Sequence, residues 1–288
     1  MVGPSDGGAP PDHKLAAALT LGGVYAGFTT WTYFAWYRKH KPLSEFRVGG
    51  DGLFGSKTYA GGADKLGHAW ATMSLARVGT ELLHQWGGYH KRTSALVATA
   101  LSELLFLGVE LKDGFYYEFS LGDAAGNTAG ALAALALSLS PRLDELFDFR
   151  VEYWPSHEYR RQFDGGNVNV AEDYSGETYL LAFHLGGLHA LRDARWGGLA
   201  RFVDVAVGFG TRGYKPDQPR GEPDYQHRQE LSIGFSLNVQ GVADWLFEGR
   251  SRAAQKIGHG VFEVFNAGYV PAVEWRRSPA GTVMTGGA

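Results

Sequence analysis

Four long apolar stretches in the first half of the chain constrain its fold more than any other feature of the sequence. They lie at residues 15–37, 66–84, 93–112 and 121–139. Turn-rich segments separate the last three, and Ser140-Pro141 is typical of a helix end. Each of these three carries ionisable residues, and a charge in hydrocarbon costs at least ~2.5 kcal/mol, so these side chains must face one another, a wet cavity or protein. The stretches therefore predict a helical bundle with a polar interior.

The first stretch, 15–37, has no formal charge and ends in an aromatic run before Arg38 and Lys39. A membrane-spanning helix needs ~20 apolar residues, and aromatic and basic residues are typical of the membrane interface. We therefore expect a helix that crosses a membrane or lies on it. Two alternatives stay open: residues 15–26 as the core of a cleaved signal peptide, and the whole stretch as a buried helix of a soluble protein.

The second half of the chain has a different pattern. Residues 142–178 are rich in charged and aromatic side chains, so we expect a covering segment or linker. Strand-like patterns follow at 179–188, 202–210, 230–239 and 270–275. Apolar and small polar residues alternate over 231–239, which predicts a half-buried strand.

The predicted fold class is α+β. It comprises a disordered N-terminus (1–14), a four-helix membrane-associated bundle (15–141), the covering segment (142–178), a small antiparallel β-rich region with short helices (179–278), and a disordered tail (279–288).

The helical stretches bring acidic, imidazole and amide side chains to one depth in the bundle. Antiparallel helices joined by short loops place residues at the same height when their numbers sum to a constant. This rule sets His68 level with Glu110, Asp64 level with Asp113, and Glu110 beside Asp123. Three pairs also share a helix face because of their spacing: Asp64 with His68, Glu110 with Asp113, and Asp123 with Asn127.

Two further features of these helices concern packing. By the same arithmetic, Arg77 comes within about one turn of Glu103, which predicts a buried ion pair. Gly122, Gly126 and Gly130 recur every four residues and form a surface that lets another helix approach closely.

Three interpretations of the polar cluster stay open. It can be a structural network, with Asp64 and Asp123 as helix caps. It can be a catalytic or proton-handling site, because perturbed polar groups gather at functional sites. It can hold a divalent ion, although no HExxH-type spacing supports one, and we assign no metal and no cofactor. As hypotheses, the catalytic residues are His68, Glu110 and Asp113, and the binding residues are Asp64, Lys65, Asp123 and Asn127.

Composition excludes several classes of function. The chain has 27 basic and 30 acidic residues and a net charge of −3, so it lacks the cationic surface that nucleic-acid binding needs. It contains no cysteine, which excludes thiolate metal sites, catalytic thiols, disulfides and a lipid-modified cysteine in the chain as written.

Three motifs follow one another in the helical region: Asp64-Lys-Leu-Gly-His68, Glu110-Leu-Lys-Asp113, and Asp123-Ala-Ala-Gly-Asn127-Thr-Ala-Gly130. Their order resembles the YfiM-like family of uncharacterised periplasmic or outer-membrane proteins. More distantly it is similar to the VanZ-like membrane proteins, which share the Asp-Lys-x-x-His and Asp-x-x-x-Asn-x-x-Gly patterns. Segments 174–179, 206–210 and 228–232 extend the resemblance over most of the chain. The resemblance implies an envelope location in a Gram-negative-type cell, and it implies no reaction.

We therefore expect a bacterial envelope protein in contact with membrane lipid, on the outer-membrane or periplasmic side or at the inner membrane, with a structural or ligand-binding cluster. One alternative is a membrane-embedded hydrolase or transferase acting on a lipid or a lipid-linked envelope precursor. In that case His68 is the general base, Glu110 or Asp113 orients it, and Asp123 and Asn127 bind a head group. A second alternative is a scaffold that binds an envelope protein partner.

Overall fold

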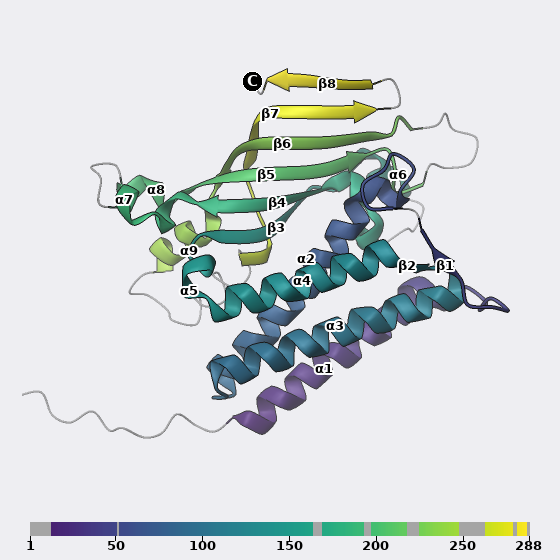
Figure 1. Ribbon diagram of the computed structural model, residues 1–288, viewed down its shortest axis with the longest axis horizontal. Helices are drawn as coiled ribbons and strands as arrows, with labels where there is room; N and C mark the ends of the chain where they lie inside the picture. Colours follow the sequence, from purple (N-terminus) through teal and green to yellow (C-terminus); the bar gives the residue numbers. More distant parts are fainter. Residues whose placement is uncertain are drawn as a thin grey trace, which may run out of the picture.

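The computed structural model describes residues 13–50, 52–163, 169–192, 197–217, 225–247, 263–278 and 281–286, and it combines long helices with one larger sheet (Figure 1). The long helices are α1 (Lys14–Thr32), α2 (Ala63–Glu81), α3 (Lys91–Tyr116) and α4 (Leu121–Leu139). Two π-helical segments extend α1 and α2, namely η1 (Tyr33–Tyr37) and η3 (Leu82–Trp86). All four predicted helical stretches are confirmed. Most of the expected disordered N-terminus, residues 1–12, lies outside the described residues.

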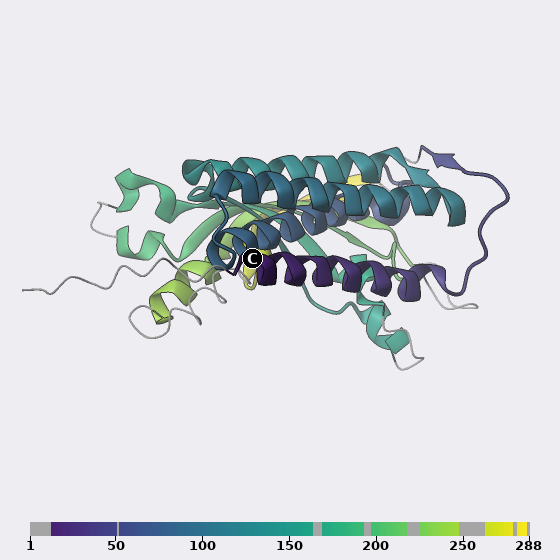
Figure 2. The ribbon, with the colours of Figure 1, turned by 90° about the horizontal axis from the view of Figure 1, so that it is seen from below.

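Helix α2 is central to the helical layer and packs against both α3 and α4. Figure 2 shows α3 and α4 side by side, and it shows α1 (purple) at the opposite edge of the helical layer from α4. Helix α1 contacts α3 through Tyr25, whose hydroxyl lies 2.7 Å from the Ser102 hydroxyl. A short parallel pair, β1 (Val48–Gly49) and β2 (Phe119–Ser120), joins the loop before α2 to the start of α4.

The main sheet is antiparallel, and its strands follow one another in chain order. The strands are β3 (Phe147–Tyr153), β4 (Glu177–His184), β5 (Val203–Arg212), β6 (Arg228–Leu237), β7 (Tyr269–Ser278) and β8 (Gly281–Gly286). The short helix α5 (Pro141–Asp144) precedes the sheet, and the short helices α6 (His157–Phe163), α7 (His189–Arg192), α8 (Gly197–Ala200) and α9 (Val239–Phe247) lie between its strands. The four predicted strands are β4 to β7.

Two strands correct the predicted boundaries. Strand β3 lies inside the segment 142–178, which we expected to be a covering segment or linker. The charged residues Asp148 and Arg150 alternate along this strand with the apolar residues Phe147, Phe149 and Val151. Strand β8 lies in the expected disordered tail, where pairing with β7 orders residues 281–286. Strand β3 pairs with β4, and β8 forms a hairpin with the adjacent strand β7.

One edge of the sheet packs on the helices. Phe147 and Phe149 contact a core that includes Met73 of α2 and Leu137 of α4. Tyr179 of β4 contributes to a second core at the start of α2. The N-terminal end of α2 therefore lies at the junction between the helical layer and the sheet.

The rest of the sheet buries its polar face. Along β6, Phe235 is 54% exposed whereas Ser236 is 3% exposed. The half-buried strand is thus confirmed, with the apolar side chains on the exposed face. The inner face is covered because the chain before β7 crosses the sheet, and Phe265 bridges to Val151 of β3 (Figure 1).

Among the described helices, α3 has the length and hydropathy of a membrane span. The core helix of a soluble protein can have the same length and hydropathy, so this one helix does not establish that the chain crosses a membrane. The segment 15–37, where we expected a span, does not reach that hydropathy. A layer of four helices is therefore present, and its association with a membrane stays a prediction.

Candidate functional site

The polar cluster forms at the N-terminal end of α2. Three consecutive residues before this helix have positive φ angles: Ala60 at 49°, Gly61 at 65° and Gly62 at 92°. A Cβ on Gly62 would lie 2.5 Å from the Leu53 carbonyl oxygen, so the turn requires glycine there. This tight turn starts α2 directly beneath the sheet and directs Asp64 and Lys65 towards α4.

His68 lies at the centre of the cluster. Its Nδ1 lies 3.1 Å from Asn127 Oδ1 on α4 and 3.2 Å from Glu110 Oε1 on α3. Its Nε2 lies 3.8 Å from Asp64 Oδ1, which is beyond hydrogen-bond distance. The predicted convergence of three helices on one polar layer is therefore what the structure shows.

Lys65 bridges two carboxylates at the base of the cluster. Its Nζ lies 3.1 Å from Asp64 Oδ2 and 2.9 Å from Asp123 Oδ1. The Tyr174 hydroxyl donates to the other oxygen of Asp64, Oδ1, at 2.7 Å. The Ser120 hydroxyl caps α4 by accepting from the backbone N–H of Asp123 at 3.1 Å. Tyr174 thus orients the Asp64 carboxylate, and Ser120 holds the backbone of Asp123 at the start of α4.

Asp113 stands apart from the other predicted site residues. Its carboxylate accepts a hydrogen bond from the Tyr37 hydroxyl at 2.7 Å, at the end of η1. It lines the same cavity as Asp64, His68 and Asp123. The structure therefore brings six of the seven predicted residues into one contact network and places Asp113 at the wall of the cavity.

Two glycines of α4 allow the close approach of α2. A Cβ on Gly126 would lie 2.5 Å from the Lys65 carbonyl oxygen, and a Cβ on Gly130 would lie 2.1 Å from that of Ala69. Neither contact leaves room for a side chain. The predicted small-residue surface therefore sets the distance between His68 and Asn127.

Burial and charge perturb the ionisable groups of the cluster. Burial raises the pKa of Glu110 to about 8, although His68 opposes the shift. Burial also raises the pKa of Asp113 to about 6, against the hydrogen bond from Tyr37. Burial disfavours the charged form of His68, but the carboxylates of Asp64, Asp123 and Glu110 outweigh it and raise the pKa of His68. Glu110 and Asp113 are therefore more readily protonated than ordinary carboxyl groups, and His68 holds its proton more strongly than an ordinary imidazole.

The two aspartates of the cluster shift in opposite directions. Burial disfavours the Asp64 carboxylate, but His68 and Lys65 outweigh it and lower the pKa of Asp64. Burial and the charge of Asp64 raise the pKa of Asp123. Of the two carboxylates that Lys65 bridges, Asp64 is thus the more acidic.

A cavity of about 520 Å³ opens over this cluster. Asp64, Lys65, His68 and Asp123 form its floor, and the His68 side chain keeps 19% of its surface exposed. Its walls include the aromatic side chains of Trp36, Tyr59, Tyr117 and Tyr174. The cluster is therefore accessible from outside the fold.

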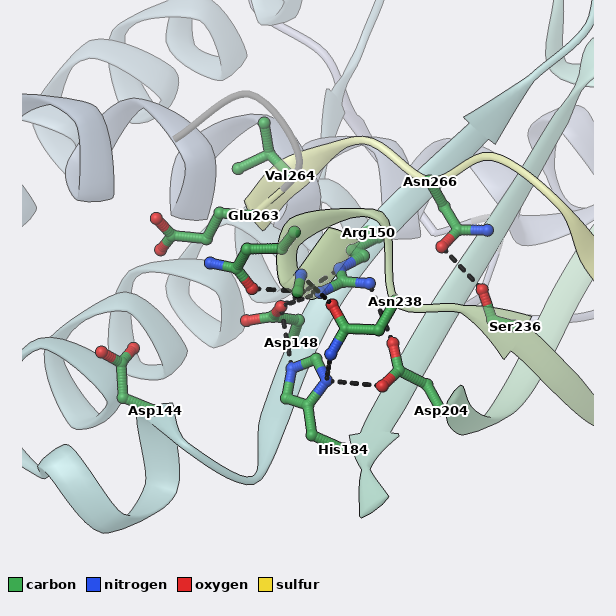
Figure 3. Close-up of polar contacts among 12 residues, drawn as sticks. Asp144, Asp148, Arg150, His184, Asp204, Ser236, Asn238, Glu263, Val264 and Asn266 are labelled. Atoms are coloured by element: carbon green, nitrogen blue, oxygen red, sulfur yellow. Dashed lines mark hydrogen bonds and ion pairs between the residues drawn. The ribbon is translucent and has the colours of Figure 1, made fainter. Parts of the chain in front are cut away.

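A second polar cluster, which we did not predict, fills the inner face of the sheet (Figure 3). His184 Nδ1 lies 2.7 Å from Asp204 Oδ1, and its Nε2 lies 3.0 Å from Asp148 Oδ2. Arg150 donates to the same two carboxylates, from Nη1 to Asp204 at 3.0 Å and from Nε to Asp148 at 3.1 Å. All four side chains are buried.

The second cluster has balanced charges. Burial opposes protonation of His184, but its hydrogen bonds to Asp148 and Asp204 outweigh burial and raise the pKa of His184 to about 9. Protonated His184 and Arg150 therefore neutralise the two aspartates. The signal in the sequence was charged residues at alternate positions of neighbouring strands, which point to one face.

Arg77 is buried, as predicted, but its expected partner was wrong. Its guanidinium pairs with Glu263 and, at 2.6 Å, with Asp144, and it donates to Ser138 at 3.1 Å. Glu103 instead accepts a hydrogen bond from Thr128 at 2.7 Å. The alignment of antiparallel helices by residue number predicts the depth of Arg77 in the bundle. It does not predict the side of α2 from which Arg77 projects.

Comparison with known proteins gives one match. Residues 50–139 match the model of a family described as "Predicted periplasmic lipoprotein (DUF2279)", which covers about a third of the chain and every cluster residue on α2, α3 and α4. No curated protein and no solved structure matches the chain. The match supports an uncharacterised periplasmic family, and with it an envelope protein of unestablished activity. The match does not support assignment of the chain to the YfiM-like or VanZ-like proteins.

Proposed function

We propose that this envelope protein binds a small positively charged ligand in the cavity over the His68 cluster. The observation that carries the proposal is the access to the cluster: the floor of the cavity consists of its ionisable side chains, and His68 is partly exposed. Side chains that line such a cavity can contact a ligand from outside the fold. Concave sites with a few convergent polar groups and perturbed pKa values are the usual place for ligand binding.

The charge of the cavity favours a cation. Its lining has more carboxylates than ammonium groups: Asp64, Asp113, Glu118, Asp123, Glu172 and Asp217 against Lys65 and Lys215. Aromatic faces also attract cations. The side chain of Lys215 already lies over the Tyr59 ring, 5.0 Å from its centroid, which illustrates this preference.

The polar atoms of the cluster are incompletely satisfied within the described residues. Asn127 Nδ2 is buried and makes no hydrogen bond there, and Glu110 Oε1 is paired with His68 Nδ1 at 3.2 Å without a hydrogen bond. Buried polar atoms in native proteins usually have partners, so the unpaired donor of Asn127 points to an additional group. This supports ligand binding over a self-contained network.

Calorimetric titration of the purified chain tests the proposal with two probes, 1,4-diaminobutane and Zn²⁺. We expect one-to-one binding of at least one probe. Asp123→Asn should weaken it by tenfold or more, because one carboxylate on the cavity floor loses its charge. Glu45→Gln removes the same charge from an exposed residue outside the cavity and should change nothing. Failure of both probes to bind at millimolar concentration would refute the proposal.

We also propose membrane lipid as the partner of the exposed sheet face. This face carries large apolar side chains over β4 to β8: Leu181, Val207, Leu231, Ile233, Phe235, Leu237, Val270 and Met284. Apolar patches of this extent are rare on soluble monomers, and a bilayer is the apolar partner that an envelope offers. In liposome flotation, Phe235→Glu should reduce the bound fraction, whereas Val170→Glu, at an exposed residue off the sheet, should not. Equal flotation of both variants would contradict this proposal.

We further propose that the chain belongs to the YfiM-like family. The three helical motifs of the resemblance, between Asp64 and Gly130, lie within the matched residues 50–139.

A further inference from the structure

We propose that Asp64, His68 and Asp123 form a binding site for a divalent first-row metal ion, with Zn²⁺ as the ion that suits the ligands best. The inference rests on the proposed function, since it names the cation that the cavity takes. One ligand atom from each residue lies within 4.8 Å of the others. Zinc at 2.0–2.2 Å from each atom would bring them to about 3.5 Å from one another, which small side-chain rotations achieve.

The orientation of His68 suits a metal ligand. Its Nδ1 faces two acceptors, Glu110 Oε1 at 3.2 Å and Asn127 Oδ1 at 3.1 Å, so this nitrogen carries the proton. Its Nε2 makes no hydrogen bond to any described residue and faces Asp64. Histidine ligands of metals typically donate their other ring N–H to a carboxylate or a carbonyl oxygen, which fixes the tautomer.

The two carboxylates are held close to each other and to His68. Lys65 contacts Asp64 through Oδ2 and Asp123 through Oδ1, and the side chains of Asp64 and Asp123 also hydrogen-bond each other. Asp64 Oδ1 faces His68 Nε2 and is oriented by the Tyr174 hydroxyl. Ligating carboxylates are usually held by such a hydrogen bond.

A separate observation points to a missing cation. Glu110 is 1% exposed, and its Oε1 accepts no hydrogen bond within the described residues while it points at His68. The acidic side chains of Asp64, Glu110 and Asp123 lie around His68, and Lys65 contacts the two aspartates. A divalent ion beside His68 would compensate the charge of these carboxylates, because buried charges require compensation.

A metal ion bound at this site would have an open coordination position. Asp64, His68 and Asp123 all line the cavity, so a fourth ligand can enter from it. Three protein ligands with one open position are typical of zinc sites that bind a further small molecule, whereas structural zinc sites are closed by four protein ligands.

Equilibrium dialysis of the full chain against Zn²⁺, with metal content measured by mass spectrometry, tests the inference. We expect one equivalent of Zn²⁺ at micromolar free metal, and no comparable binding of Mg²⁺ or Ca²⁺, which prefer all-oxygen sites. His68→Ala should weaken Zn²⁺ binding by at least a hundredfold. Glu110→Gln should weaken it by about 10–100-fold, as expected for a residue that orients a ligand. His90→Ala removes an exposed histidine outside the cavity and should have no effect.

Two measurements keep the inference testable if His68→Ala does not fold, which circular dichroism would reveal. X-ray absorption of the Zn²⁺-loaded wild-type chain should show one imidazole nitrogen and oxygen ligands at about 2.0–2.2 Å. Lys65→Met should bind Zn²⁺ more tightly, because a neighbouring positive charge is removed.

The outcomes separate the two proposals. Binding of 1,4-diaminobutane without Zn²⁺ would overturn the metal site and leave the cation-binding function standing. Binding of neither probe would overturn both. Equal Zn²⁺ binding by wild type and a folded His68→Ala variant, or an absorption spectrum without a single imidazole, would mean an adventitious ion only.

Discussion

The contact between α2 and α4 provides a sharp test of how the cluster is held together. Gly130 of α4 lies against the backbone of Ala69 in α2, one residue after His68. A Cβ at Gly130 would lie 2.1 Å from the Ala69 carbonyl oxygen, whereas ordinary van der Waals contact begins at 3.4 Å. Gly130→Ala therefore requires the two helices to separate by about 1.3 Å, the difference between these distances.

The expected loss of stability is the balance of two effects. Overpacking a well-packed contact costs about 1–3 kcal/mol, and more where backbone rather than a flexible side chain must move. Replacing glycine by alanine inside a helix gains about 1 kcal/mol. Because the atoms in the way belong to the backbone of Ala69, we expect the first effect to exceed the second, with a net destabilisation of about 1–2 kcal/mol.

Urea unfolding of the purified chain, followed by circular dichroism, measures this balance. Gly108→Ala is the matched control, because Gly108 lies inside α3, is exposed, and has no atom within 4 Å of its added Cβ. The control should gain about 0.5–1 kcal/mol in free energy of unfolding. If both variants raise the midpoint with an unchanged m-value, the tight helix contact is not rigid and our reasoning is refuted.

Three further predictions concern buried polar groups. The pKa of His184 is raised to about 9 in the folded chain, above the ordinary 6.5, so its stabilising contribution should be complete below pH 6.5 and disappear as the pH rises through 9. This contribution is at most ~3 kcal/mol, and the difference in unfolding free energy between wild type and His184→Ala should shrink over that range; a constant difference would contradict it. Arg77→Met should cost about 3–5 kcal/mol, because Glu263 loses its partner in a buried place, and the double variant with Glu263→Gln should recover part of the loss in urea unfolding. Tyr174→Phe removes a hydrogen bond to the Asp64 carboxylate and should cost about 1.5–3 kcal/mol in the same assay, whereas an unchanged midpoint would show that this bond contributes little.

The helices and the height of the cluster could be predicted from the sequence. Helix α4 begins after Ser120, which caps it, and ends before Pro141, so its bounds of 121 and 139 are encoded locally. Antiparallel packing through short loops then aligns His68 with Glu110 and Asp123, since each helix rises by a constant distance per residue.

The partners of buried charges could not be predicted in the same way. Arg77 pairs with Glu263, 186 residues away, and His184 pairs with Asp148 and Asp204 on neighbouring strands. Alternation along a strand shows which charged residues share a face, but their partners depend on which surfaces pack together.

The chain by itself determined its helices, most of its strands, and the depth at which the ionisable side chains of α2, α3 and α4 meet, because capping, periodicity and helical rise act over a few residues. Only the tertiary structure decided that the sheet turns its polar face inward, that β3 and β8 extend it, and that the His68 cluster opens into a cavity. The inward polar face and the open cavity depend on contacts between segments far apart in the sequence, where the free energy of burial and charge pairing is summed over the whole fold.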